Sequence, residues 1–272
     1  MITASIVIYN SSKKDLQTVV ACVSNSVINS IYVIDNAPND SLKEFTQGLS
    51  EKVVYIQGQG NIGYGAAHNI AMREAIKQNV KYHIALNPDI EFVDGVIETL
   101  RDYMDANLNT GLIMPKIVYP DGELQYLCKL LPTPMDWIGR RFIPWKNITE
   151  RRNNWFELRD TGYSQIMNIP YLSGCFMFFR VDVLKEIGIF DEGIFMYGED
   201  TDITRRIHRK YKTIFYPNVQ INHVHQKESH KSSRLLWIHI KAAVYYFNKW
   251  GWLFDRERRI INKNVIKSYL TN

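Results

Sequence analysis

The chain has 272 residues, 46% hydrophobic and 22% charged, which is ordinary for a soluble globular protein. No apolar run approaches the roughly 18–20 residues of a membrane span, and the first residues lack the pattern of a signal peptide, so we expect neither. The net charge of +5 comes from residues 227–272, where ten lysines and arginines face three carboxylates, so residues 1–226 sum to −2.

The first 120 residues alternate β-rich runs with helical patterns. We expect strands over 5–10, 31–36, 53–57 and 83–87, and helices over 14–25, 41–50 and 66–79. Strands that alternate with helices at this pitch predict βαβ units and a mostly parallel sheet. Ligands bind such sheets at the carboxyl ends of the strands, where this chain has turn-formers, glycines and carboxylates.

The second half begins with a predicted helix over 94–107 and a strand over 111–119. Residues 121–170 are less regular. A strand over 175–180 and a helix over 181–188 lead into the acidic stretch MYGEDTDI, and a helix over 203–211 and a strand over 213–223 follow it. From Ser232 the pattern is helical. The cysteines, Cys22, Cys128 and Cys175, have no metal spacing and are expected to be reduced thiols of a cytoplasmic protein.

The loop GQGNIG, Gly58 to Gly63, fits the dinucleotide-binding pattern G-x-G-x-x-G between a strand and a helix. The match is isolated, because the loop follows the third strand and its nearest downstream acid, Asp89, lies 26 residues past Gly63. An oxidoreductase that binds NAD is therefore one alternative function. A tight turn without a ligand is another explanation of the glycines.

The motifs at the strand ends, taken in order, resemble the family 2 glycosyltransferases of the GT-A fold, especially their rhamnosyltransferase-like branch. The resemblance spans residues 3–240 and is most specific from Leu172 to Ile207. The matching segments are SIVIYN, VIDNAPND, GNIGYGAAHNIA, LNPDI, the block LSGCFMFFRVDVLKEIGIFDEGIFMYGEDTDITRRI, and NHVHQKES.

The resemblance implies a Rossmann-like α/β domain, with a mostly parallel sheet and flanking helices, over residues 1–226. Residues 1–120 would be its nucleotide-binding half and residues 121–226 its acceptor and catalytic half. Residues 227–272 would form a helical appendage, a basic aromatic tail. The implied reaction is inverting transfer of a sugar, with rhamnose as the leading expectation, from a dTDP- or UDP-sugar to an acceptor hydroxyl.

The same resemblance assigns roles to residues at the strand ends. Asp35 would bond the base or ribose, although an ordinary Asx turn at Asp35 and Asn36 is the alternative. The residues expected to bind the nucleotide sugar are Tyr9, Asp35, Asn61, Gly63, Asn69 and Asn87.

The leaving diphosphate calls for a divalent cation, Mg²⁺ or Mn²⁺, which prefers oxygen ligands. The segment LNPDI resembles a metal-binding D-x-D motif, which makes Asp89 the expected ligand and leaves Asn87 at the first acidic position. His223 matches a family histidine near the metal, with His225 as a competitor. Lys227 is a further candidate for a phosphate contact.

Inverting transfer needs one base for the attacking hydroxyl. The resemblance places it in the pair Glu199 and Asp200, with Asp200 preferred, and a helix N-terminus there would keep the carboxylate ionised. Asp202 is interpreted as a helix cap and Glu192 as a solvated loop residue. Arg205 and Arg206 would pair with these acids or with phosphate.

The tail interleaves aromatic residues with lysines and arginines, which favours contact with an anionic membrane face. A helix packed on the domain is the main alternative, and nucleic acid is not expected. An insert with Trp137, Arg140, Arg141, Trp145, Arg151, Arg152 and Trp155 has the same character and is a candidate acceptor contact. We therefore expect a cytoplasmic enzyme, peripheral at the inner face of the membrane, acting on a lipid-linked saccharide or oligosaccharide of a cell-surface polysaccharide. A non-catalytic partner that keeps the fold is the remaining alternative.

Overall fold

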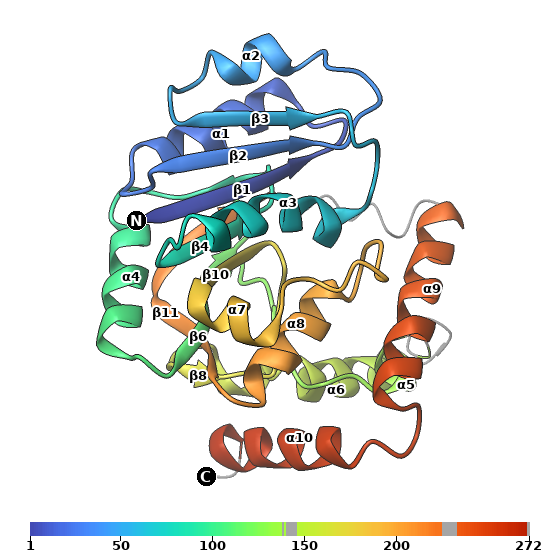
Figure 1. Cartoon of the computed structure of the whole chain (residues 1–272). Helices are drawn as coiled ribbons and strands as arrows, with labels where there is room; N and C mark the ends of the chain where they lie inside the picture. Colours follow the sequence, from blue (N-terminus) through green and yellow to red (C-terminus); the bar gives the residue numbers. More distant parts are fainter. Residues whose placement is uncertain (138, 140–145, 225–232, 271–272) are drawn as a thin grey trace.

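The structure is a computed structural model that describes residues 1–137, 139, 146–224 and 233–270. Its centre is a nine-stranded sheet in the order β3-β2-β1-β4-β10-β6-β11-β5, with β8 paired to β11 outside this path (Figure 1). The strands are β1 (Ile2–Ile8), β2 (Ser30–Asp35), β3 (Val53–Gln57), β4 (Tyr82–Leu86), β5 (Ile90–Glu91), β6 (Thr110–Val118), β7 (Cys128–Lys129), β8 (Met167–Asn168), β9 (Tyr171–Leu172), β10 (Phe176–Arg180) and β11 (Lys212–His223).

The described helices surround this sheet. They are α1 (Lys13–Ser24), α2 (Lys43–Gln47), α3 (Tyr64–Lys77), α4 (Val96–Ala106), α5 (Pro134–Trp137), α6 (Lys146–Phe156), the 3₁₀ helix η2 (Arg159–Thr161), α7 (Val181–Ile187), α8 (Glu199–His208), α9 (Ser233–Trp250) and α10 (Arg256–Tyr269). None of them is long and apolar enough to cross a bilayer.

The sheet is mixed but mostly parallel. The pairs that join β1 to β4, β1 to β2, β2 to β3 and β6 to β11 are parallel, whereas β10 runs antiparallel to both of its neighbours. β1 is buried along its whole length because helices cover both faces of the sheet, which explains its nearly continuous apolar sequence. The predicted α/β fold is confirmed.

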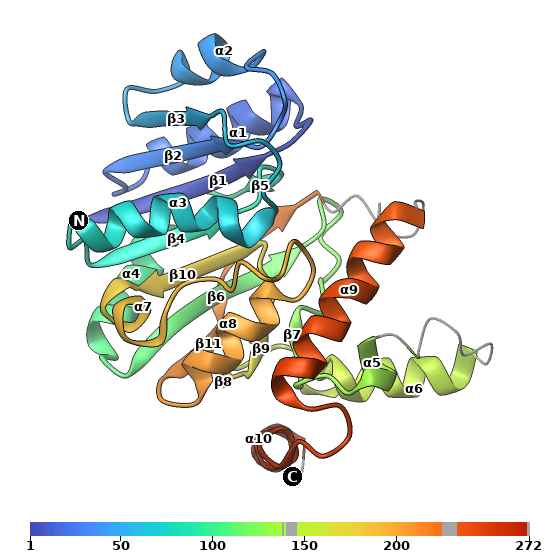
Figure 2. The same ribbon diagram turned by 45° about the vertical axis from the view of Figure 1, so that its right-hand side comes forward.

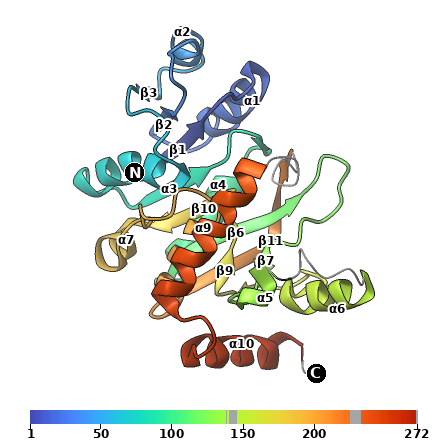
Figure 3. The same cartoon turned by 90° about the vertical axis from the view of Figure 1, so that its right-hand side faces the viewer.

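The two faces of β1 bury different helices. Ile6 packs in the main core with Leu16 and Val19 of α1, while Val7 packs with Ala67 of α3. Figure 3 shows the sheet nearly edge-on, with α3 and α1 on opposite sides of β1. This alternation follows from the period of two of a strand. Because β1, β2 and β3 are parallel, their carboxyl ends lie at the same edge of the sheet, on the side of α9 (Figure 1).

The segments that carry β7, α5, α6 and β9, together with α9, form a lobe beside that edge. β7 pairs with β9 in a separate two-stranded sheet, and α5 packs against α9. Figure 2 shows α5, α6 and α9 together at the side of the central sheet, with α10 beneath them. The part of the tail that the structure describes, residues 233–270, forms α9 and α10, and it packs on the domain through α8, as described below. The three cysteines are free thiols.

Candidate active site

A cleft of about 620 Å³ lies between the carboxyl edge of the sheet and the lobe. It brings together four of the residues predicted to bind the donor or metal or to act as the base, Asn87, Glu199, Asp200 and His223, of which Asn87 and His223 are 136 residues apart. Its other walls come from the connection after β6, from Trp137 of α5 and from His239 of α9. Deep clefts with convergent polar groups are the usual form of a ligand site.

The turn before α8 aims its first residues into the cleft. Tyr197 has a φ of 70°, a left-handed conformation that is uncommon for a non-glycine residue, and Gly198 follows with a φ of 128°. A β-carbon at Gly198 would lie 2.7 Å from the Trp137 ring, so the turn also needs the absence of a side chain there. Helix α8 therefore begins at Glu199, earlier than the predicted start at 203.

Asp200 is held in the cleft by donors on both carboxylate oxygens. Oδ2 accepts a hydrogen bond from the Gly174 backbone N–H at 3.0 Å, and Oδ1 accepts from the Thr201 N–H at 2.7 Å and from its hydroxyl at 3.3 Å. Burial raises the pKa of Asp200, while the Gly174 N–H and the charge of Lys129 oppose that rise. These donors favour the ionised carboxylate, which is the form that accepts a proton.

Glu199 has a different environment. It is 5% exposed, and its Oε2 has no hydrogen-bond partner within the described residues. Burial, followed by the negative charge of Asp200, raises the pKa of Glu199 to about 8, against weaker opposition from nearby backbone N–H groups. A pKa of about 8 favours the protonated form of Glu199 at neutral pH, while the hydrogen-bond donors around Asp200 favour its carboxylate form.

Asp89 and His223 meet at the sheet edge next to Asn87. The Asp89 Oδ1 lies 3.3 Å from Nε2 of His223, and the Asn87 amide nitrogen lies 3.3 Å from the same ring nitrogen. The antiparallel pairing of β5 with β11 sets Ile90 opposite His223 and so holds the two segments in register.

Gln125, which the sequence did not single out, orients this histidine. Its amide nitrogen donates to the His223 carbonyl oxygen at 2.8 Å, and its Oε1 lies 2.9 Å from Nδ1 of the ring. An oxygen at that position requires the proton on Nδ1, which leaves Nε2 as the nitrogen with a lone pair. A second partner that fixes the tautomer is typical of histidines that bind metals.

These residues fit Mg²⁺ or Mn²⁺ that is also held by a diphosphate. One carboxylate and one imidazole nitrogen face the same point, and such cations take few protein ligands because phosphate oxygens and water complete the shell. Within the described residues no three histidine, cysteine or acidic side chains gather to form a complete protein site. His225 and Lys227 lie outside the described residues.

The other residues predicted to bind the nucleotide sugar do not line this cleft. Tyr9 is 48% exposed after β1, and Asn61 is exposed in the loop before α3. Asp35 is buried at the end of β2, where Oδ1 accepts from the Ala37 N–H and Oδ2 from the Tyr55 hydroxyl. Asp35 thus forms an Asx turn and also anchors Tyr55.

Gly63 and Asn69 support the loop that leads to α8. A β-carbon at Gly63 would lie 2.3 Å from the Phe195 carbonyl oxygen, so this glycine permits close contact between two backbone segments. Asn69 donates to the Phe190 carbonyl oxygen and to Glu192, and it accepts from the Phe190 N–H. Glu192 is half exposed and also pairs with Arg73.

The interpretation of Asp202 as a helix cap was wrong. Asp202 is the fourth residue of α8 and is fully buried, and its carboxylate accepts from Arg206 at 2.7 Å and from the Trp250 indole at 2.8 Å. Arg205 pairs with acids of the tail instead of with the acidic pair of the cleft. The tail therefore supplies partners for two charges that the sequence had connected with the site, Asp202 and Arg205.

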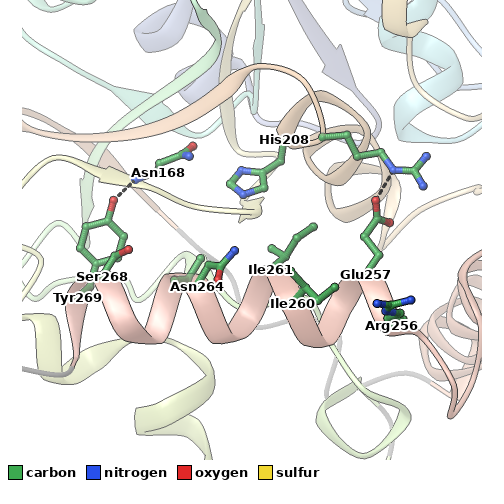
Figure 4. A pocket seen from close by; sticks show the side chains of 11 residues that line it. Asn168, His208, Arg256, Glu257, Ile260, Ile261, Asn264, Ser268 and Tyr269 are labelled. Atoms are coloured by element: carbon green, nitrogen blue, oxygen red, sulfur yellow. Dashed lines mark hydrogen bonds and ion pairs between the residues drawn. The ribbon is translucent and has the colours of Figure 1, made fainter.

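A second cavity, of about 750 Å³, lies between α10 and the segment from α8 to β8 (Figure 4). Some of its polar groups are bonded to one another, since Arg209 pairs with Glu257 and the Tyr269 hydroxyl accepts from the Asn168 N–H. None of the predicted site residues lines it. The smaller cleft is therefore the candidate active site.

Solved structures with a similar fold are glycosyltransferases. GalNAc-T7 with UDP, GalNAc and Mn²⁺ superposes with a TM-score of 0.62 at 16% identity, over 84% of this chain and 43% of that one. The mannosyltransferase PcManGT from Pyrobaculum calidifontis, in complex with GDP-Man and Mn²⁺, gives a TM-score of 0.57 at 14% identity, over 98% of this chain and 74% of the other. These likenesses establish the GT-A type of α/β fold.

Proteins of similar sequence are also glycosyltransferases. An N-acetylglucosaminyl-diphospho-decaprenol L-rhamnosyltransferase from Mycobacterium tuberculosis is 25% identical over 246 residues, 84% of this chain and 75% of the relative. The low-salt glycan biosynthesis hexosyltransferase Agl10 from Haloferax volcanii is 24% identical over 208 residues, 76% of this chain and 62% of that protein. The family model described as glycosyl transferase family 2 matches residues 3–188, so this chain belongs to that family and resembles its rhamnosyltransferases.

Proposed function

We propose that this glycosyltransferase moves a sugar from a nucleoside diphosphate to a saccharide hydroxyl with inversion, and that Asp200 is the base. The observation that carries the proposal is the cleft itself, which Asp200 and His223 line together, with Asp89 next to His223 at the sheet edge. The acceptor oxygen bonds to the anomeric carbon, the bond from that carbon to the diphosphate breaks, and the hydroxyl proton passes to Asp200.

Asp89 and the Nε2 of His223 would hold Mg²⁺ or Mn²⁺, which supplies positive charge to the leaving diphosphate when bound. Gln125 keeps Nε2 available by holding the ring proton on Nδ1. Glu199, neutral beside Asp200, avoids a second negative charge near the leaving group. Tyr9, Asp35, Asn61, Gly63, Asn69 and Asn87 remain the proposed contacts or supports of the nucleotide sugar.

The relatives and the lining of the cleft support a choice of donor and acceptor. The mycobacterial relative is named for L-rhamnose transfer to a diphospho-decaprenol saccharide, which supports a dTDP-rhamnose donor, with a UDP-sugar as the alternative, and a lipid-linked acceptor. Tyr126, Tyr171 and Trp137 give the cleft flat apolar surfaces that suit sugar rings. The product would belong to a cell-surface polysaccharide.

A ligand panel tests this function directly. We expect dTDP or UDP with Mn²⁺ to raise the melting temperature of the protein, and NAD to leave it unchanged. The stabilising nucleotide then names the sugar donors for a transfer assay with short saccharides. Stabilisation by none of them, together with no hydrolysis or transfer of any nucleotide sugar, would favour a non-catalytic partner that keeps the fold.

A further inference from the structure

The connection between α9 and α10 exposes three consecutive apolar side chains. Phe254 is 90% exposed, Leu253 67% and Trp252 39%. Isolated exposed apolar residues are common, but a run of three large ones at a corner of the molecule is not explained by packing. Figures 1 and 2 show this corner at the outer end of α9, away from the central sheet.

The backbone of this corner is fixed. The Trp252 indole donates to the Asn248 side chain at 2.8 Å, and Arg258 donates to the Trp252 carbonyl oxygen at 3.1 Å. Asp255 caps α10 by accepting from the Arg258 N–H at 2.9 Å, and it is also buried against Arg205. The turn that carries Leu253 and Phe254 is therefore held by hydrogen bonds, and both side chains are exposed to solvent.

The net charge around the corner is positive. The segment from Ser233 to Leu270 contains eight lysines and arginines but only two acids, Asp255 and Glu257. Both acids are engaged by arginines of α8. The exposed side of α10 thus presents Arg256, Arg259 and Lys263, which recur at helical spacing around the half-exposed Ile260.

We infer that Trp252, Leu253 and Phe254, with Arg256, Arg259 and Lys263, form a docking corner for the surface of an anionic lipid bilayer. The apolar side chains enter the interface between headgroups and acyl chains, and the basic side chains bind the lipid headgroups. The apolar side chains thus match the boundary of the acyl chains, and the basic side chains match the layer of anionic headgroups.

Docking at this corner would attach to the bilayer a helix that also lines the cleft. His239 of α9 lines the cleft and accepts a hydrogen bond from the Trp137 indole at 3.2 Å, so the helix that ends at the corner is also a wall of the site. This consequence rests on the proposed transfer to a lipid-linked acceptor. The docking itself does not depend on that activity.

The test is co-sedimentation of the full chain with vesicles of phosphatidylcholine, with and without phosphatidylglycerol. We expect binding only to the vesicles with phosphatidylglycerol. Leu253→Ser/Phe254→Ser should weaken it about tenfold or more, and Arg256→Gln/Lys263→Gln about fivefold for each charge removed. The matched control is Val93→Ser/Leu108→Ser, which removes two equally exposed apolar side chains elsewhere and should bind as wild type does.

Three results would overturn the inference: no binding by the wild-type chain, equal binding to both kinds of vesicle, or equal binding by the Leu253/Phe254 variant. Binding of a mixed-sequence oligonucleotide in place of vesicles, lost in the charge variant, would assign the corner to nucleic acid and also overturn it. Transfer to a water-soluble acceptor should be the same in all variants. Intact vesicle binding without any transfer would refute the proposed function and leave the docking corner standing.

Discussion

Arg205 of α8 and Asp255 of the tail form a bidentate ion pair in the interior of the protein. Nη1 lies 2.7 Å from Oδ2 and Nη2 lies 2.9 Å from Oδ1, and neither side chain is more than 3% exposed. The Trp250 ring lies 4.1 Å from the Arg205 guanidinium carbon and covers it. The tail is thereby fastened to the helix whose first turn carries Asp200.

Removal of one partner of this pair should be costly. Asp255→Ala leaves the buried Arg205 with Glu257 as its remaining ion-pair partner and also removes the cap of α10. We therefore expect the free energy of unfolding to fall by roughly 3–5 kcal/mol. Urea denaturation measures this change. Arg73→Ala is the control, because its ion pair with Glu192 is half exposed and should contribute less than about 1 kcal/mol. Similar losses in the two variants would contradict the anchoring role of Asp255.

Glu199→Gln should keep the transferase active, because an amide resembles the neutral acid. If Glu199 were the base, the same change would cost about 100-fold or more in turnover. The measurement is the rate of transfer at pH 7 with saturating donor. A loss of that size would move the catalytic assignment from Asp200 to Glu199.

The same substitution should stabilise the fold at alkaline pH. The pKa of Glu199 in the folded protein, about 8, lies above its ordinary value of 4.5, so folding favours the protonated acid. The free energy of unfolding of the wild type therefore decreases as pH rises from 4.5 to 8, and the glutamine removes this decrease. We expect the melting temperature of the variant to exceed that of the wild type at pH 8 and the difference to shrink toward pH 4.5. A constant difference would show that Glu199 does not titrate in this range.

Gln125→Leu should weaken the metal site without touching a metal ligand. It removes the acceptor that holds the His223 proton on Nδ1, and loss of such a partner typically costs 10–100-fold in metal affinity. Mn²⁺ binding by the nucleotide complex, followed by electron paramagnetic resonance, measures this directly. The exposed Gln17→Leu is the matched control. Unchanged Mn²⁺ affinity in Gln125→Leu would contradict the assignment of His223 as a ligand.

Ser5 of β1, His83 of β4 and His68 of α3 form a buried hydrogen-bond network that should lower the free energy of unfolding in acid. Ser5 bonds both His68 and His83, and burial lowers the pKa of His83 to about 3 and that of His68 well below its ordinary 6.5. Because the folded pKa values lie below 6.5, the stabilisation is complete above that pH and decreases as pH falls, by up to about 1.4 kcal/mol per unit for each histidine. Urea titrations between pH 7 and 5.5 in the Glu199→Gln background should show this decrease. Equal stability at both pH values would contradict it.

The strands and helices of the first half of the fold could be predicted because the sequence patterns that specify them are local. The apolar runs of β1 to β4 and the helical spacing of α1, α3 and α4 appear directly in the sequence, and the structure places these elements within a few residues of the predictions. Asn87 and His223 lie at strand ends, where ligands of such sheets bind, whereas Asp200 was placed by the resemblance to the family.

Other features depend on partners that are distant in the sequence. Gln125 contacts His223 across 98 residues, from a segment with no regular pattern. Asp202 looked like a cap because acids are common there, yet its partner Trp250 lies 48 residues downstream, and burial by the tail decides its role. Periodicity and local motifs contain no information on such pairings.

The central claim, that Asp200 is the base of an inverting transfer, is tested most directly by Asp200→Asn. We expect transfer to fall by at least about 100-fold, while calorimetry shows donor nucleotide and Mn²⁺ bound with nearly wild-type affinity. Asp182→Asn, at a side chain that is 81% exposed, should leave both quantities unchanged. Turnover of Asp200→Asn close to that of the wild type would contradict the account.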